Sequence, residues 1–139
     1  HDFTVYFIDI ADGIDQVLQA LGQQEIEAYG GIIGAYQHNE ALAASRLPVI
    51  TALFTDLDTE GVADYLRHSN IVAALFNPLS YCGRQAGEMS ADILDRTMEI
   101  QETIPRPARQ VTFINMQAAA RMQVTIPFVA LEAVDIVIK

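Results

Sequence analysis

The sequence predicts an α/β domain built on an open parallel sheet flanked by helices. Short apolar runs rich in β-branched residues alternate with segments whose apolar residues recur at helical spacing. Such alternation is typical of βαβ units with right-handed crossovers. The chain has 139 residues, of which 51% are hydrophobic and 19% charged. This length suits one domain, and the composition is too apolar for a disordered chain.

The first half of the chain contains four strand patterns and three helix patterns. The first strand pattern, FTVYFIDI, is followed by Asp12 at an N-cap position, by apolar residues at helical spacing and by Gly22 as a stop signal. The run LPVITALF is almost continuously apolar, as in a fully buried parallel strand. Strands are expected at 3–10, 28–36, 48–54 and 71–76, and helices at 12–22, 38–46 and 59–68.

The second half begins with a helix pattern at 83–94, GRQAGEMSADIL. Four of its side chains are expected to face a core, namely Ala86, Met89, Ile93 and Leu94. A polar linker with two prolines follows at 99–109, and a strand is expected at 110–114. Asn115 is the expected N-cap of a short helix through Met122, and residues 131–138 form a last apolar stretch.

The charge balance excludes several classes of partner. Eight basic side chains stand against 18 acidic ones, which gives a net charge of −10. Nucleic-acid binding depends on Lys and Arg against phosphates, so no nucleic-acid partner is expected. Docking on anionic lipid is disfavoured for the same reason. No apolar stretch approaches the roughly 18 residues of a transmembrane helix.

Motifs for cofactor, metal or catalytic chemistry are missing from the sequence. The glycines of GGIIG at 30–34 lack the spacing of a dinucleotide-binding loop, and there is no GxSxG nucleophile motif. His1, His38 and His68 are scattered, without a His or Cys partner at metal-binding spacing. We therefore expect no cofactor, no metal and no catalytic residue.

Two smaller features have a structural interpretation that outweighs the functional one. Asp56, Asp58 and Glu60 cluster as calcium ligands or acid–base groups would, but they lack the spacing of an EF-hand. They are better explained as acids at a helix N-terminus. The single cysteine, Cys82, excludes an intramolecular disulfide, and Arg84 is its only obvious activator, so we expect an inert thiol.

Polar residues follow the strand patterns at the edge where an open parallel sheet binds its ligands. These residues are Asp9, Tyr36 and Gln37, Thr55 and Asp56, and Asn77. The set is small and polar with one aromatic ring, which suits a small polar ligand. Ordinary loop polarity is an equally good interpretation of the same residues.

Two segments of the second half carry a family resemblance. SYCGRQAGEMSADIL at 80–94 resembles the YxxGRQxGEMAAxIL helix of ABC-transporter substrate-binding proteins, in the group that includes tryptophan- and other aromatic amino-acid-binding members. FINMQAAARMQVTIPFVALEAVDIVIK at 113–139 resembles the INxxTAxxLGxTIPxxLLxxADxVI terminus of that family. The first 79 residues match more loosely and depart from the pattern at 37–39 and 59–69.

The resemblance implies a type I periplasmic-binding-protein fold, in which two α/β lobes close on a ligand like a hinged clamp. Residues 1–79 would form a unit like the second lobe. Residues 80–139 would supply the helix that crosses the hinge and the C-terminal closing segments. The chain would then be a compact piece of a longer protein.

This arrangement leaves apolar surface without its usual cover. Helix 83–94 and strand 110–114 would lack the sheet of the first lobe, and exposed apolar patches of that size are unusual in monomers. Either these segments fold back onto residues 1–75, or two chains exchange them in a homodimer. The exchange is the favoured hypothesis.

The resemblance implies a solute-binding component of an ABC importer, located in the periplasm or outside the cell and in some forms lipid-anchored. It would capture a small polar ligand such as an amino acid without catalysis and then engage a permease. Tyr36 would stack on the ligand, Asp56 would take its ammonium group, Gln37 and Asn77 would orient it, and Thr55 would line the site.

The alternative function is the extracellular ligand-sensing domain of a membrane receptor such as a histidine kinase. An enzyme on the same fold is the third class, because a fold alone does not determine function. It is set aside because the sequence offers no nucleophile–base pair, metal set or cofactor loop.

Overall fold

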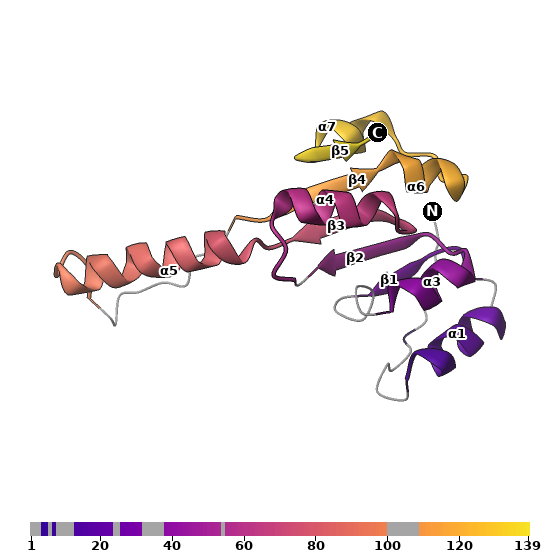
Figure 1. Ribbon diagram of the computed structural model, residues 1–139, viewed down its shortest axis with the longest axis horizontal. Helices are drawn as coiled ribbons and strands as arrows, with labels where there is room; N and C mark the ends of the chain where they lie inside the picture. The colour runs from indigo at the N-terminus through magenta and orange to yellow at the C-terminus, as the bar shows by residue number, and fades with distance from the viewer. Residues whose placement is uncertain are drawn as a thin grey trace.

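The computed structural model describes residues 4–5, 7, 13–23, 26–31, 38–53, 55–99 and 109–139. Five strands form one sheet in the order β1-β2-β3-β4-β5. Figure 1 shows the sheet at the centre of a layered body, with α5 reaching out from one end. The chain is therefore of the α/β class, with a sheet that is mostly parallel.

The strands β1 (Tyr29–Gly31), β2 (Val49–Leu53) and β3 (Ile71–Phe76) are parallel neighbours. Helix α3 (Asn39–Ser45) connects the first two, and α4 (Thr59–Arg67) connects β2 with β3. Helix α1 (Ile14–Gln23) precedes them. The predicted helix–strand alternation of this region is confirmed; of the expected strand at 28–36, β1 occupies residues 29–31, and residues 32–36 lie outside the described ones.

The strand β4 (Val111–Asn115) runs antiparallel to β3, which corrects the expectation of an all-parallel sheet. The chain leaves the sheet after Phe76 through α5 (Leu79–Leu94) and enters β4 at Val111, which is paired with Phe76. Because the chain departs and returns at the same edge, the next strand has to run in the opposite direction. The final strand β5 (Ile136–Ile138) is parallel to β4.

The segment after β4 packs onto the same sheet. Asn115 caps α6 (Met116–Arg121) as predicted, since its side-chain oxygen accepts a hydrogen bond from the Ala118 amide at 3.1 Å. Helix α7 (Phe128–Glu132) follows, and β5 then completes the sheet. Within the one chain, β4 pairs with β3 of the first half, and β5 pairs with β4.

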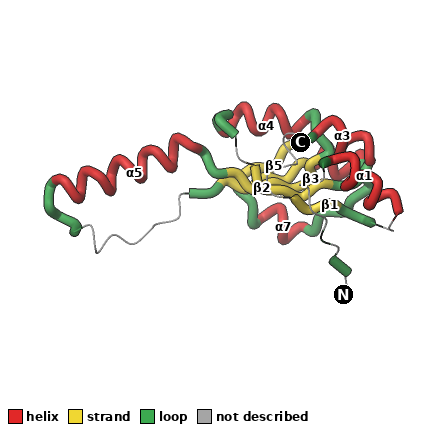
Figure 2. Tube along the Cα trace, turned by 90° about the horizontal axis from the view of Figure 1, so that it is seen from below, coloured by secondary structure: helices red, strands yellow, loops and turns green. Residues whose placement is uncertain are grey.

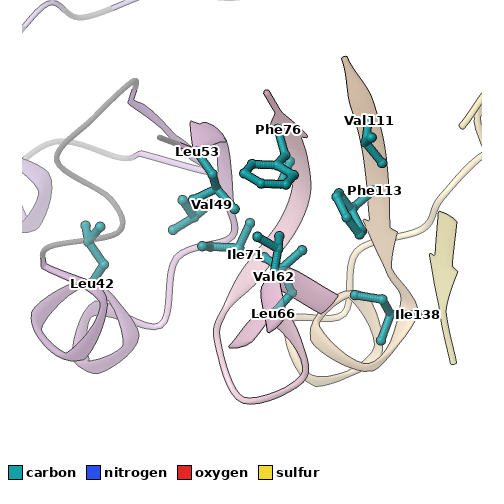
Figure 3. Packing of buried hydrophobic residues seen from close by; sticks show 11 residues of the cluster. Leu42, Val49, Leu53, Val62, Leu66, Ile71, Phe76, Val111, Phe113 and Ile138 are labelled. Carbon is teal, nitrogen blue, oxygen red and sulfur yellow. The ribbon is translucent and has the colours of Figure 1, made fainter. Parts of the chain in front are cut away.

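The main core lies between the sheet and the helices α1, α3 and α4, which cover one face of it (Figure 2). Helix α4 contributes Val62 and Leu66, both fully buried. Figure 3 shows these side chains against those of the strands. The eleven buried members are Leu42, Val49, Leu53, Val62, Leu66, Ile71, Ala74, Phe76, Val111, Phe113 and Ile138.

A smaller cluster lies where α6 packs against part of the opposite face of the sheet. Val72 packs there with Ala118 and Ala119, and the bulge that shifts the register between β2 and β3 lies next to it. On β2 the expectation of a strand buried on both faces is wrong, since Ile50 is 55% exposed. Helix α6 lies mainly against β3 and β5.

Helix α5 projects away from the sheet in both views (Figures 1 and 2). It begins four residues earlier than expected, and none of its residues is buried. The expectation that Ala86 and Leu94 face a core is wrong, because both are exposed, Leu94 at 81%. Met89 and Ile93 are half-buried. The helix pattern was correct, but the described part of the chain supplies no surface that buries it.

The described helices include none that is both long and apolar enough to cross a bilayer. The expected strand at 3–10 and the linker at 99–109 fall mostly outside the described residues.

Candidate ligand-binding edge of the sheet

Three neighbouring strand ends meet at one edge of the sheet. Leu53 at the end of β2 pairs with Phe76 at the end of β3, and Phe76 pairs with Val111 at the start of β4. Neighbouring strands are about 4.8 Å apart, so the residues just beyond these pairs lie close together. We call this region the carboxyl edge. It includes Thr55, Asp56 and Asn77 together with the start of α5 and Arg109.

Thr55 and Asp56 form a turn between β2 and α4. The Thr55 hydroxyl donates to Asp56 Oδ1 at 3.4 Å and accepts the backbone N–H of Leu57 at 3.2 Å. Thr55 is half-buried and Asp56 is exposed. The Asp56 carboxylate forms no ion pair with any described residue. A carboxylate at a strand end that has no cationic partner can bind a cationic group of a ligand.

Asp58, two residues further on, has a structural role. Its side chain accepts a hydrogen bond from the Gly61 amide at 2.8 Å and caps α4. Glu60 lies in the first turn of the same helix. The interpretation of the acidic cluster as a helix N-terminus is confirmed, and the described residues contain no group of three or more potential metal ligands.

Asn77 follows β3 directly and is half-buried. The next residue, Pro78, is buried and occupies the N-cap position of α5, which has no side-chain cap. Asn77 thus stands where the chain leaves the sheet. Tyr36 and Gln37, and with them Asp9, lie outside the described residues.

Two arginines gather on Tyr81 at the same edge, and the sequence did not single them out as ligand-binding residues. The guanidinium carbon of Arg84 lies 6.0 Å from the centre of the Tyr81 ring, and that of Arg109 lies 5.9 Å from it. Tyr81 is half-buried and packs against the main core. The Tyr81 ring, in the first turn of α5, therefore contacts the body of the protein and lies near Arg109, two residues before β4.

Arg109 also faces Asp135, whose carboxylate lies 4.0 Å from its guanidinium group. Both the backbone N–H and the hydroxyl of Thr112 donate to Asp135, at 2.9 and 2.8 Å. These hydrogen bonds, together with the charge of Arg109, hold the pKa of Asp135 below its usual value. Asp135 is therefore an ionised neighbour of the largely exposed Arg109.

Only part of this arrangement was visible in the sequence. Tyr81 and Arg84 are three residues apart, which places them together on one helix face. Arg109 comes directly before a strand pattern, but its place at this edge depends on the antiparallel direction of β4. Because a strand pattern does not reveal its direction, Arg109 could not be linked to Tyr81.

The described groups at this edge include both signs of charge and a side-chain amide. They are a carboxylate without an ion-pair partner among the described residues, a half-buried amide and two arginines beside one ring. Cys82 is half-buried in α5, and His68 ends α4 at its C-cap position. His68 donates its backbone N–H within that cap.

An apolar hollow lies elsewhere on the described surface, between α1 and α3. Its volume is about 340 Å³, and it is mostly apolar. The residues around it are Leu18, Gly22, Ala41, Ala44, Ser45 and Leu47. It carries none of the charged groups found at the carboxyl edge.

Comparisons of the chain with protein-family models, with curated proteins and with solved structures found no match.

Proposed function

We propose that this protein is the solute-binding component of an ABC importer and captures a small polar ligand, such as an amino acid, at the carboxyl edge of its sheet. The ligand is bound and released unchanged. The protein acts outside the cytoplasmic membrane and passes the ligand to a permease. The resemblance of residues 80–94 and 113–139 to that family supports the proposal.

The observation that carries the proposal is the path of the chain around α5. The chain leaves the sheet at Asn77 and Pro78 and re-enters it at Val111, which pairs with Phe76. Between these points it forms a helix of 16 residues with none buried. Two adjacent crossings that lead to an uncovered helix are what a hinged clamp requires, because α5 would pack on the facing lobe when a ligand is enclosed.

The polar residues of the carboxyl edge have separate roles in this proposal. Asp56 takes the ammonium group, since its carboxylate has no cation among the described residues. Thr55 holds Asp56 through its 3.4 Å hydrogen bond. Asn77 orients the ligand with its amide. Tyr36 and Gln37, which lie outside the described residues, would complete the site as predicted from the sequence.

Asp56→Ala tests the role of the carboxylate. We expect this variant to weaken binding of L-tryptophan and of tryptamine, which both carry an ammonium group, by at least about tenfold, because a charge-assisted hydrogen bond contributes roughly 1.5–3 kcal/mol. Dissociation constants are measured by NMR titration, which detects millimolar binding. Glu60→Gln is the matched control, since it removes an exposed carboxylate four residues away. Unchanged affinity in Asp56→Ala would contradict the assignment.

A further inference from the structure

We propose that Arg84 and Arg109, each about 6 Å from the centre of the Tyr81 ring, form a carboxylate-binding subsite at the carboxyl edge. The inference rests on the proposed function in one respect, because it names the second charged group of the captured solute. A ligand that satisfies both Asp56 and this subsite is a zwitterion with a free carboxylate, which is the chemistry of an amino acid.

The first argument is the convergence of two cations from distant parts of the chain. Arg84 belongs to the first half of α5, and Arg109 precedes β4. Each guanidinium carbon lies about 6 Å from the centre of the same ring. An aromatic ring attracts a guanidinium group, so Tyr81 favours the presence of both arginines beside it. Tyr81 itself packs on the main core, so the ring beside the two arginines has a fixed place next to the sheet.

The second argument is the charge balance of the pair. Among the described residues, Asp135 is the only acid that forms an ion pair with either arginine, through Arg109 at 4.0 Å. Arg84 has no acidic partner in the described part of the chain, which leaves one positive charge uncompensated in a strongly acidic protein. A planar guanidinium group matches a carboxylate with two parallel N–H donors, so a bound carboxylate supplies the missing charge.

The start of α5 strengthens the attraction for an anion. Its N-cap residue is Pro78, no side chain caps it, and no acid lies in its first turn. The amides of Leu79 and Ser80 have no acceptor among the described residues, as expected for the first amides of a helix. The positive end of the helix dipole therefore adds to the charge of the arginines.

The test follows the side-chain Nε–Hε signals of the arginines in the ¹⁵N-labelled chain while acetate replaces chloride at constant ionic strength. We expect the signals of Arg84 and Arg109 to shift along a saturating curve. The signal of Arg67, which is exposed and paired with Asp64 at 3.2 Å, should show only a linear drift. In Arg84→Gln the acetate affinity read from the Arg109 signal should fall about fivefold or more, whereas Arg67→Gln should leave it unchanged.

The tyrosine is tested with two substitutions. Tyr81→Phe keeps the ring and should keep the acetate affinity, while Tyr81→Leu keeps an apolar side chain against the core but removes the aromatic face and should weaken binding. Equal shifts at Arg67, shifts that never saturate, or tighter binding of inorganic phosphate than of acetate would overturn the inference. Tryptamine separates the two proposals, because its binding requires Asp56 and is independent of Arg84.

Discussion

Replacement of Asn115 by Ala tests how firmly the C-terminal segment is joined to the sheet. Asn115 is buried at the junction of β4 and α6. Its oxygen accepts the Ala118 amide at 3.1 Å, and its nitrogen donates to the carbonyl of Leu66 at the end of α4. One side chain thus connects β4, α6 and α4.

The expected loss of stability follows from these two hydrogen bonds. Loss of an N-cap costs about 1 kcal/mol, and a buried hydrogen bond contributes about another 1 kcal/mol. The Ala118 amide is fully buried and would be left unpaired, which adds up to about 1 kcal/mol. The Leu66 carbonyl keeps the Ser69 amide and hydroxyl as donors, so it adds little. We expect a total of about 2–3 kcal/mol.

Urea unfolding followed by far-UV circular dichroism measures this loss as a lower midpoint with an unchanged slope. Asp58→Ala is the matched control, because it removes the cap of α4 at an exposed site where water can replace the lost bond. We expect about 1 kcal/mol or less for the control. Equal losses in the two variants would refute the reasoning, since burial of the Asn115 bonds is what separates them.

Two further predictions concern the core and the acid at the edge. Leu66→Ala should lower the free energy of unfolding in urea by about 2–5 kcal/mol, because Leu66 is fully buried. Leu94→Ala should lower it by less than about 0.5 kcal/mol, because Leu94 is 81% exposed. A large loss of stability in Leu94→Ala would mean that α5 packs on the body of the protein. The lowered pKa of Asp135 stabilises the fold at pH values above the ordinary pKa of an aspartate, about 4, and this contribution disappears as the pH falls through the lowered value. Thr112→Val removes the hydroxyl that donates to the Asp135 carboxylate and also accepts the Asp135 amide at 3.1 Å. Its urea midpoint should differ most from the wild type above about pH 4, and the difference should shrink in acid to the part that comes from the amide bond. A difference that stays constant with pH would contradict the assignment.

Local patterns predicted most of the helices and strands. Apolar spacing located α1, α4 and β3, and the polar residue before an alanine-rich run identified Asn115 as a cap. These features depend on neighbouring residues along the chain, so the sequence contains their whole cause. The positions of Thr55, Asp56 and Asn77 at strand ends followed from the same patterns.

The features that escaped prediction depend on contacts between distant segments. A strand pattern is the same in either direction, so the antiparallel β4 could not be foreseen, and with it the meeting of Arg109 and Tyr81. The apolar residues of α5 reveal a face but not what covers it. Ile50 was expected to be buried and is exposed for a similar reason, because its burial depends on which distant segments pack on that face of the sheet.

The central claim is that the carboxyl edge binds a small zwitterion, and an NMR titration of backbone amides tests it most directly. The ¹⁵N-labelled chain is titrated with each of the standard L-amino acids. We predict that at least one produces saturable shifts at Thr55, Asp56, Asn77 and the first turn of α5. Shifts confined to the apolar hollow between α1 and α3, or no saturable shift with any amino acid, would contradict the claim.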